Sequence, residues 1–231
     1  MKPLYLLLVS SFLFACNAYR TSPESEVLFT KQDLTKPGFV VSPIIDLTPG
    51  NTTSVADANA FDTILTNTLK EQWKKVSLLS VTDITQILDG EQVEDWRDAL
   101  KKEKADKGSE STLKLLKKLT IQGKSYPSQA LLPGVLQNSV SCGHKEPLST
   151  YLSPKPQGPK AYCQRVMKMR FRIMDLENSE ILWNGIVYAT QETTTPSSHK
   201  DSEEDPVIDP PSTQALIREC FSNFAKQFAE K

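Results

Sequence analysis

Hydrophobic and polar positions along the chain predict a first strand and a first helix. Residues 38–47 are mostly apolar or β-branched, which is typical of a strand buried on both faces, and Pro43 indicates an edge or a bulge within it. A helix is predicted from Ser54 to about Trp73, because apolar positions recur three and four residues apart. Ser54 with Asp57 three residues later is typical of a helix start. The apolar stripe consists of Phe61, Ile64, Leu65, Thr68 and Leu69.

The middle of the chain predicts a short strand followed by helices. The strand is expected over 76–81, and a helical turn over 84–88 is opened by Thr82 and Asp83. A charged helix follows over about 91–104, and a further helix comes after it. Their apolar positions are Val93, Trp96 and Leu100 in the first and Leu113, Leu116 and Leu119 in the second.

Three more strands are predicted in the second half of the chain. Residues 129–140 form one, bent at Pro133–Gly134. Residues 165–173 and 181–189 form an antiparallel pair joined by a turn over 175–180. In the strand 165–173, Arg165, Met167, Met169, Phe171 and Ile173 share one face, while Lys168, Arg170 and Arg172 share the other. The basic face is typical of a solvated strand, with an acidic partner as the alternative.

The C-terminal part predicts a capped helix after a polar segment. Ser212 caps the helix, and the polar segments at about 143–160 and 192–211 are expected to be flexible loops. The apolar face of the helix consists of Ile217, Cys220, Phe221, Phe224 and Phe228. The order of the elements predicts an α/β (α+β) fold, in which a mixed β-sheet has a β-α-β start, closing antiparallel strands and helices packed on it. Residues 37–231 would form this single globular domain.

The N-terminus has the pattern of an export signal. Lys2 precedes an apolar run from Leu4 to Ala15, and a basic start, an apolar stretch of this length and a small final residue are typical of secretory signal peptides. The run is shorter than the ~20 residues that a transmembrane helix needs. Residues 1–15 are therefore predicted to be a signal peptide, and residues 16–36 a polar, flexible tether.

The end of the signal resembles the lipobox of bacterial lipoproteins. Leu13, Ala15 and Cys16 fit its spacing, whereas Phe14 departs from it, since small or branched residues are usual there. The resemblance implies cleavage before Cys16 and attachment of several acyl chains to that residue, which hold a protein firmly on a membrane. Asn17 follows instead of the aspartate that favours retention in the inner membrane, so the outer membrane is expected. An ordinary secretory signal with an accidental cysteine is the alternative.

Length and charge narrow the class of protein. About 215 residues remain after the predicted cleavage, which is enough for one medium domain with its own core. Acidic and basic residues nearly cancel, 28 against 27. Nucleic-acid binding would require a clustered basic excess, so no nucleic-acid partner is expected.

Three cysteines follow Cys16, and an odd number leaves at least one thiol unpaired. Cys142 and Cys163 flank the Pro-rich loop between two predicted strands, and a disulfide there would close a loop of about 22 residues and stabilise the fold by ~3 kcal/mol. Cys220 lies on the apolar face of the last helix, which predicts a buried free thiol. Three unpaired thiols are the alternative. A metal cluster of Cys142, His144 and Cys163 fits no standard zinc spacing, so no metal is expected.

The sequence contains no recognisable catalytic pattern. The histidines, His144 and His199, lie in predicted loops, and neither a glycine-rich phosphate loop nor a nucleophile elbow is present. Trp96 and Trp183 are typical of core packing, with partner binding as the alternative. Three aspartates near strand ends are more typical of caps and turns than of acid–base catalysis: Asp46, Asp83 and Asp175. A non-catalytic binding protein is therefore expected, with no cofactor and no small-molecule substrate.

Several segments resemble the LpoB / CsgG / TolB amino-terminal-domain-like family of bacterial lipoproteins. Residues 39–46 resemble the opening strand of that family, residues 78–88 its second strand and next helix, and residues 116–134 its later helix and glycine-ended strand. The strongest similarity is in residues 171–185, because the family closes with a strand, a turn and a strand that bears a tryptophan. The resemblance spans about residues 37–230 and implies a TolB amino-terminal-domain-like fold.

The resemblance also implies a function. It indicates a lipid-anchored accessory protein of the outer membrane, facing the periplasm, that binds and activates a peptidoglycan synthase of the penicillin-binding protein class. The membrane contact would be made by the lipid on Cys16. The tether departs from LpoB-like proteins, because its twenty or so residues reach at most about 70 Å. A subunit of a CsgG-like secretion or envelope-assembly complex is one alternative, and an envelope enzyme is another.

Overall fold

The predicted sheet has six strands in the structure, a computed structural model. It describes residues 38–50, 54–86, 88, 90–102, 112, 114–115, 127–145, 160–195 and 208–228. The strands are β1 (Phe39–Val41), β2 (Ile45–Asp46), β3 (Leu78–Leu79), β4 (Gln129–Lys145), β5 (Lys160–Asp175) and β6 (Glu180–Thr195). The helices are α2 (Val55–Gln72), α3 (Val81–Thr85), α4 (Gly90–Lys102) and α6 (Thr213–Lys226).

Several predicted features lie outside the described residues. These are the signal peptide 1–15, Cys16, the tether 16–36, His199, and the leucines Leu113, Leu116 and Leu119 of the further helix. Within that last segment, Thr112, Lys114 and Leu115 are described and are helical.

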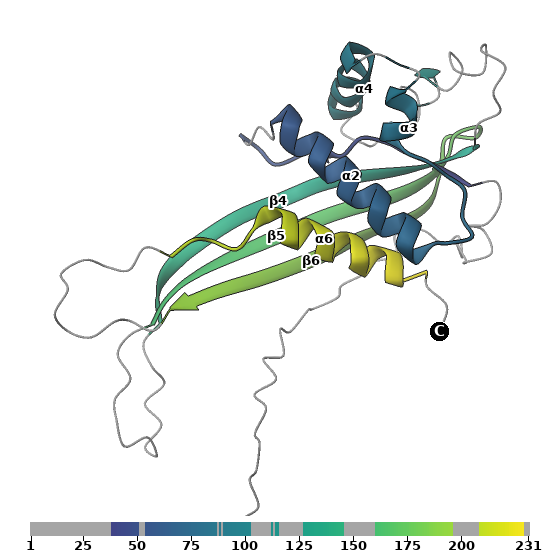
Figure 1. Cartoon of the computed structure of the whole chain (residues 1–231). Helices are drawn as coiled ribbons and strands as arrows, with labels where there is room; N and C mark the ends of the chain where they lie inside the picture. The colour runs from purple at the N-terminus through teal and green to yellow at the C-terminus, as the bar shows by residue number, and fades with distance from the viewer. Residues whose placement is uncertain are drawn as a thin grey trace, which may run out of the picture.

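The sheet is parallel at its start and antiparallel at its end. β1 pairs in parallel with β3 on one side and β4 on the other, and β2 also pairs in parallel with β4. β4, β5 and β6 then follow one another as antiparallel neighbours. The order β3-β1-β4-β5-β6, with α2 as the crossover between β1 and β3, confirms the predicted mixed sheet with a β-α-β start (Figure 1).

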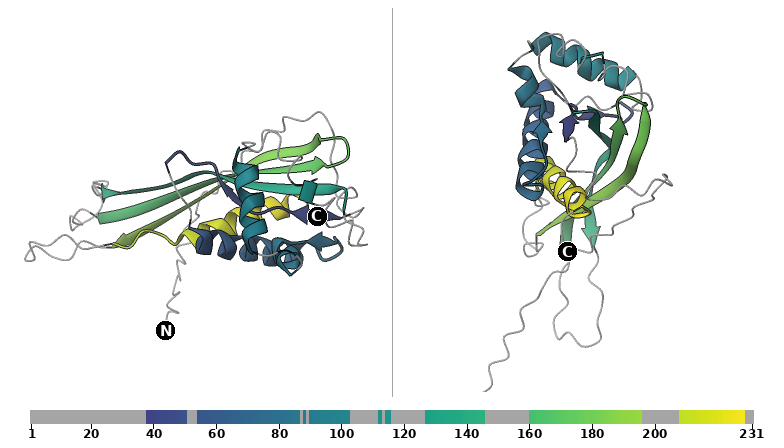
Figure 2. Two further views of the ribbon diagram at one scale, coloured as in Figure 1. Left: turned by 90° about the horizontal axis from the view of Figure 1, so that it is seen from above. Right: turned by 90° about the vertical axis from the view of Figure 1, so that its right-hand side faces the viewer.

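Two hydrophobic cores lie on the two faces of the sheet. Consecutive residues of a strand point to opposite faces, so Phe39 and Val41 join the first core while Val40 joins the second. α2 and α6 pack on the first core, and residues of α3 and α4 belong to the second. Figure 2 shows α2 and α6 side by side on one side of the sheet and α4 across its end.

The N-terminal elements begin and end for identifiable reasons. Between β1 and β2 the chain leaves the sheet at Pro43, which has no N–H to donate to a neighbouring strand. Helix α2 begins as predicted, because Ser54 Oγ accepts a hydrogen bond from Asp57 N at 3.1 Å. The prediction that Thr82 and Asp83 open the next helix was wrong. Ser80 caps it, and Ser80 and Asp83 form a reciprocal capping box that ends the strand early.

The three long strands run further than predicted. β4 reaches Lys145, β5 begins at Lys160 and β6 reaches Thr195, so the predicted loops 143–160 and 192–211 begin or end inside strands. Hydrophobic alternation does not detect these ends, because they are held by strand pairing and a cross-strand disulfide rather than by a core. We name residues 138–145, 160–166 and 190–195 the arm, which projects beyond the helices (Figure 1).

Both tryptophans singled out in the sequence pack as core residues, as predicted. Trp96 is 4 % exposed, and its Nε1 donates to Thr112 Oγ1 at 3.2 Å. Trp183 lies partly buried against the first core, with its ring centroid 5.4 Å from that of Phe224 and 5.3 Å from that of Phe228. These aromatic contacts join β6 to the C-terminal helix.

Gly185 leaves room for the Trp183 ring. A Cβ at position 185 would lie 2.2 Å from Trp183 Cη2 and 2.6 Å from Cζ2. The ring has little freedom to move, because Phe224 and Phe228 surround it. Gly185→Ala is therefore expected to lower the free energy of unfolding by about 1–3 kcal/mol, measured by chemical denaturation.

Gly143→Ala is the matched control for this change. It lies in β4, and a Cβ there would come no closer than 3.4 Å to any neighbour, the ring of Tyr162. Its free energy of unfolding should stay within about 0.5 kcal/mol of the wild-type value. Equal losses in both variants would show that crowding of Trp183 is not the cause.

Candidate protein-binding face

One face of the long strands belongs to neither core. We name it the open face and define it by side chains from β5 and β6: Val166, Lys168, Arg170, Ile186, Tyr188 and Thr190. All six are partly exposed, and none is a member of either hydrophobic cluster. The side chains that alternate with them along β5, such as Met167 and Met169, are fully buried beneath α6. The open face is therefore the solvent side of a sheet whose other side is packed.

The strand register fixes the arrangement of the open face. Lys168 lies directly opposite Tyr188, Arg170 opposite Ile186, and Val166 opposite Thr190. The Lys168 ammonium lies 5.4 Å from the centroid of the Tyr188 ring, a cation–π distance that contributes about 0.5–1 kcal/mol at an exposed site. Gln137, Ser139 and Ser141 extend the same face across β4 and are exposed.

The basic face predicted for β5 is only partly solvated. Lys168 and Arg170 are partly exposed, but Arg172 is only 8 % exposed. It lies opposite Leu132 and Asn184, where the sheet enters the second core. The prediction of a solvated Arg172 was wrong, because the alternation of the strand does not show where a second core begins. Two cationic side chains, an aromatic ring and two aliphatic side chains remain together on the open face. Arginine and tyrosine, present here as Arg170 and Tyr188, are residue types enriched in protein interfaces, whereas lysine is depleted there.

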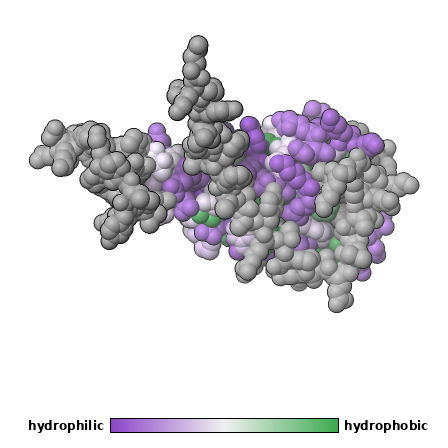
Figure 3. Space-filling model, turned by 90° about the horizontal axis from the view of Figure 1, so that it is seen from below, coloured by the Kyte–Doolittle hydropathy of each residue, from purple (hydrophilic) through white to green (hydrophobic). Residues whose placement is uncertain are grey.

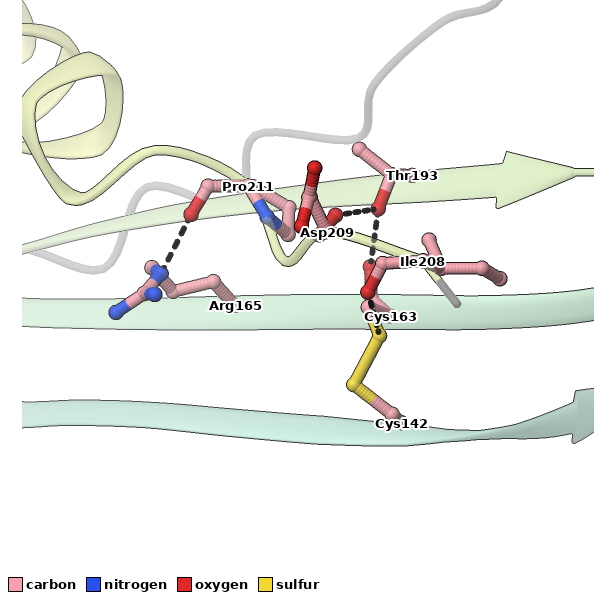
Figure 4. Close-up of a disulfide and its surroundings, with 7 residues drawn as sticks. All are labelled: Cys142, Cys163, Arg165, Thr193, Ile208, Asp209 and Pro211. Atoms are coloured by element: carbon pink, nitrogen blue, oxygen red, sulfur yellow. Dashed lines mark hydrogen bonds between the residues drawn. A yellow bond between two sulfur atoms is a disulfide. The ribbon is translucent and has the colours of Figure 1, made fainter. Parts of the chain in front are cut away.

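The opposite side of the arm is covered by the segment that leads into α6. Arg165 Nε donates to Pro211 O at 2.6 Å, and Arg165 Nη1 donates to Asn138 Oδ1 at 3.0 Å. Thr193 Oγ1 donates to Asp209 O at 2.9 Å (Figure 4). Residues 208–211 are thereby held across β5 and β6. Arg165, which shares the otherwise apolar face of β5, thus holds this segment in place.

A disulfide lies beneath the same segment. Cys142 and Cys163 are direct partners in the β4–β5 register and are joined to each other in the structure (Figure 4). Cys163 Sγ lies 3.5 Å from Ile208 O, which is a contact and not a hydrogen bond, because a disulfide sulfur carries no hydrogen. The metal alternative for Cys142, His144 and Cys163 is contradicted, since a bridged pair offers no thiolate to a metal.

The remaining cysteine is buried, as predicted. Cys220 is fully buried on the inner face of α6 and is a free thiol. Burial raises the pKa of the Cys220 thiol, and Glu219 raises it further. It is therefore held as the neutral thiol, which is unsuited to nucleophilic or metal chemistry.

The three candidate aspartates act in turns and caps, as predicted. Asp46 Oδ1 accepts from Thr48 N at 2.9 Å. Asp175 Oδ1 accepts from Glu177 N at 2.8 Å in the β5–β6 turn. Burial raises the pKa of Asp83, but the hydrogen bonds that it accepts from Ser80 outweigh burial and lower its pKa below the ordinary value. These carboxylates therefore accept backbone hydrogen bonds and shape turns and caps.

A buried ion pair, which the sequence did not reveal, joins α2 to α4. Arg97 Nη2 lies 2.8 Å from Asp62 Oδ2, and the two side chains are 3 % and 4 % exposed. Asp62 Oδ1 also accepts from Ile44 N at 2.8 Å, and Arg97 donates to Asn59 Oδ1 at 3.1 Å and to Glu94. Burial is the largest cause that raises the pKa of Asp62 to about 6, against the lowering effects of the Ile44 hydrogen bond and of Arg97. The pair ties three segments together: α2, α4 and the backbone at Ile44.

A small cavity beside Trp96 does not suit an active site. Its volume is about 200 Å³, below the ~300–1,000 Å³ that is typical of ligand sites. Its lining residues are Leu88, Gln92, Asp95, Trp96, Ala99, Lys114 and Leu115, which include no histidine, cysteine or serine. Figure 3 shows the molecule from below, where the described residues are mainly hydrophilic with small, separate hydrophobic patches.

Comparison with known proteins identifies only distant similarities. No protein-family model and no curated protein matches the chain. Among solved structures, a PelC dodecamer from Paraburkholderia phytofirmans is 11% identical, with a TM-score of 0.42 over 92% of this chain and 99% of that one. The LpoB C-terminal domain from Salmonella enterica is 12% identical, with a TM-score of 0.34 over 70% and 96%. Lipoprotein GNA1162 from Neisseria meningitidis is 13% identical, with a TM-score of 0.36 over 82% and 96%.

These similarities are too distant to assign the chain to a family. The chain is therefore described from its own structure. It is an α+β domain with an open strand face, a cross-strand disulfide and aspartates that serve in turns and caps. Within the described ranges, no helix is both long and apolar enough to cross a membrane.

Proposed function

We propose that this protein is a lipid-anchored accessory protein of the bacterial envelope that binds a protein partner through the open face and performs no catalysis itself. The observation that carries the proposal is the open face. Its six side chains are two cations, a tyrosine, two aliphatic groups and a threonine, on a surface that neither core covers. Because these side chains stand on a paired sheet, binding would cost little conformational entropy for ordering the backbone.

Two features support a place outside the cytoplasm. The signal-like N-terminus with Cys16 provides for export and anchoring. The Cys142–Cys163 disulfide suits an oxidising compartment, because disulfides persist in the periplasm and are rare in the cytosol. The outer membrane, facing the periplasm, is the proposed location.

The first partner to test is a penicillin-binding protein, on the basis of the LpoB-like segments of the sequence. The folded domain would bind a non-catalytic domain of this synthase and shift the population of its active state, which is a coupling between two distinct sites. Cationic side chains on the open face favour an acidic surface on that domain. The tether limits the partner to within about 70 Å of the anchoring membrane.

Charge reversal on the open face tests the proposal. Lys168→Glu should reduce recovery of the partner in a crosslinking pull-down from intact cells by about tenfold, a loss of ~1.4 kcal/mol in binding, because it removes one cation from the face and adds an anion. Lys101→Glu on α4 is the matched control, since Lys101 is 43 % exposed but lies away from the open face. Both variants should stay folded, with a melting temperature within a few degrees of the wild-type value, because Lys168→Glu loses only the exposed cation–π contact with Tyr188.

Two outcomes of this experiment would contradict the proposal. Equal recovery with both variants would exclude the open face as the binding surface. Recovery of a partner of another kind, with the same dependence on Lys168, would keep the binding face and reject the penicillin-binding protein.

Replacement of the predicted lipid-bearing residue gives a separate prediction. Cys16→Ala should prevent lipid attachment, because no thiol remains to receive the diacylglyceryl group. The expected result is loss of labelling by radioactive palmitate, followed by a shift in solubility during detergent phase separation. Cys220→Ala should keep the label, and labelling of the Cys16→Ala protein would show that the signal is not a lipobox.

A further inference from the structure

The outer edge of β6 is the longest unpaired strand edge of the sheet among the described residues. β6 has 16 residues and pairs only with β5, whereas β3, at the other end of the sheet, has two residues. In an antiparallel strand with a single neighbour, about every second residue directs its N–H and C=O away from that neighbour. Such an edge is a template on which another strand can pair.

The usual devices that prevent pairing are missing from this edge. Between Trp183 and Thr195 there is no proline, lysine or arginine, and Glu192 is the single charged residue. The one irregularity in the β5–β6 register lies near Trp183, and the remainder of β6 is regular. Helix α6 packs on the face of β5 and β6, and among the described elements none runs alongside the outer edge of β6 (Figure 1). Natural edge strands of this length are normally blunted by charges, bulges or proline.

We propose that the β6 edge pairs antiparallel with the β6 edge of a second copy of this chain, about a twofold axis. Charge compatibility favours this occupant. Glu192 is the sole charged residue of the segment. In an antiparallel self-pairing it faces Glu192 of the other copy only if the twofold axis passes through that residue, so every other register avoids repulsion between like charges. With the axis at Tyr188, the two tyrosines face each other, Ile186 faces a threonine and Asn184 faces a glutamate. Aromatic, aliphatic–threonine and amide–carboxylate pairs are all acceptable across antiparallel strands.

The pairing has a consequence for the open face. Twofold axes of antiparallel pairs run perpendicular to the sheet, so both copies would present their open faces on the same side. Lys168 and Arg170 of each copy would then lie on one continuous six-stranded surface made from β4, β5 and β6 of both copies. The pairing itself needs neither the proposed partner nor the lipid.

Solution measurements on the lipidated full-length mature protein in detergent test the pairing. Sedimentation velocity should show a monomer that converts to a dimer as protein concentration rises. Hydrogen exchange should show alternate amides of residues 184–194 slowing by about tenfold or more over the same range, while amides of α2 stay unchanged. A monomer at every concentration, or a dimer whose β6 amides exchange as in the monomer, would overturn the proposal.

Two proline variants sharpen the test. Ala189→Pro and Thr190→Pro are neighbours, and the alternation of a strand makes one of them remove an outward N–H and the other a hydrogen bond to β5. The variant that loses the outward N–H should keep the monomer fold and lose the dimer. Dimers that persist in a folded variant of this kind would contradict β6 pairing, and if neither variant folds, the exchange result on the wild type decides. Failure here leaves the Lys168 pull-down result unaffected, so the two proposals fail separately.

Discussion

Arg97→Met is expected to lower the free energy of unfolding by about 3 kcal/mol at pH 8 and by much less at pH 5. Arg97 and Asp62 are both almost completely buried and lie 2.8 Å apart. Removing the guanidinium leaves the Asp62 carboxylate buried without its charge partner, which typically costs ~3–5 kcal/mol. Methionine fills much of the same volume, so packing contributes little to the loss.

The pH dependence follows from the direction of the Asp62 pKa. Burial raises this pKa from 3.8 to about 6 in the folded protein, so the folded state holds the proton more tightly than the unfolded state does. The wild-type stability from this group is therefore fully present below about pH 4 and is lost as the pH rises through about 6. Arg97 lowers the Asp62 pKa, so its removal raises that pKa further and extends the loss to higher pH.

Chemical denaturation of four proteins at the two pH values separates the causes. Asp62→Asn should flatten the wild-type pH dependence, because a neutral amide cannot ionise. The double variant Asp62→Asn/Arg97→Met should also be flat and should recover part of the stability lost by Arg97→Met alone. Glu94, which touches Arg97, is 36 % exposed and is common to all four proteins. A loss from Arg97→Met that is equal at pH 5 and pH 8 would show that Asp62 does not titrate between them.

The sequence contains a signal for the buried pair, but hydropathy alone does not predict which two charges meet. Arg97 lies four residues after Val93 and one after Trp96, on the apolar face of its helix, and Asp62 lies beside Phe61 in the stripe of α2. A charge on the apolar side of each of two helices is the available signal. Which charge meets which depends on how α2 and α4 pack, and that contact spans 35 residues of sequence.

The sequence predicted well those elements whose hydrogen bonds are local or whose apolar side chains all lie on one face. The stripe of α2 and the alternation of β5 follow from periodicity, and the turn over 175–180 follows from its polar residues between two strands. The outer ends of the arm were missed because they lie beyond both cores, so strand pairing and a disulfide hold them without the hydrophobic alternation that marks a strand. The open face itself is readable only from the register, since Lys168 and Tyr188 are twenty residues apart and meet through the β5–β6 pairing.

Cys142→Ser is expected to lower the free energy of unfolding by about 3 kcal/mol. The two cysteines are separated by 21 positions, and the chain-entropy model assigns a value of this size to a loop of that length. Cys142 is exposed, so serine adds no buried polar group at its position, whereas Cys163 is 2 % exposed and would be a poorer choice. Urea denaturation without reductant measures the effect.

The structure places the loss in the arm, because the helices and both cores lie elsewhere. Hydrogen exchange in the Cys142→Ser protein should therefore accelerate in residues 138–145 and 160–166, the paired strand ends that the disulfide joins. The amides of α2 should change far less. Reductant provides the matched control: it should lower the wild type to the level of the variant and leave the variant unchanged, since the buried Cys220 has no disulfide to lose. A variant as stable as the oxidised wild type would mean that strand pairing alone holds the arm, so that the disulfide adds nothing to it.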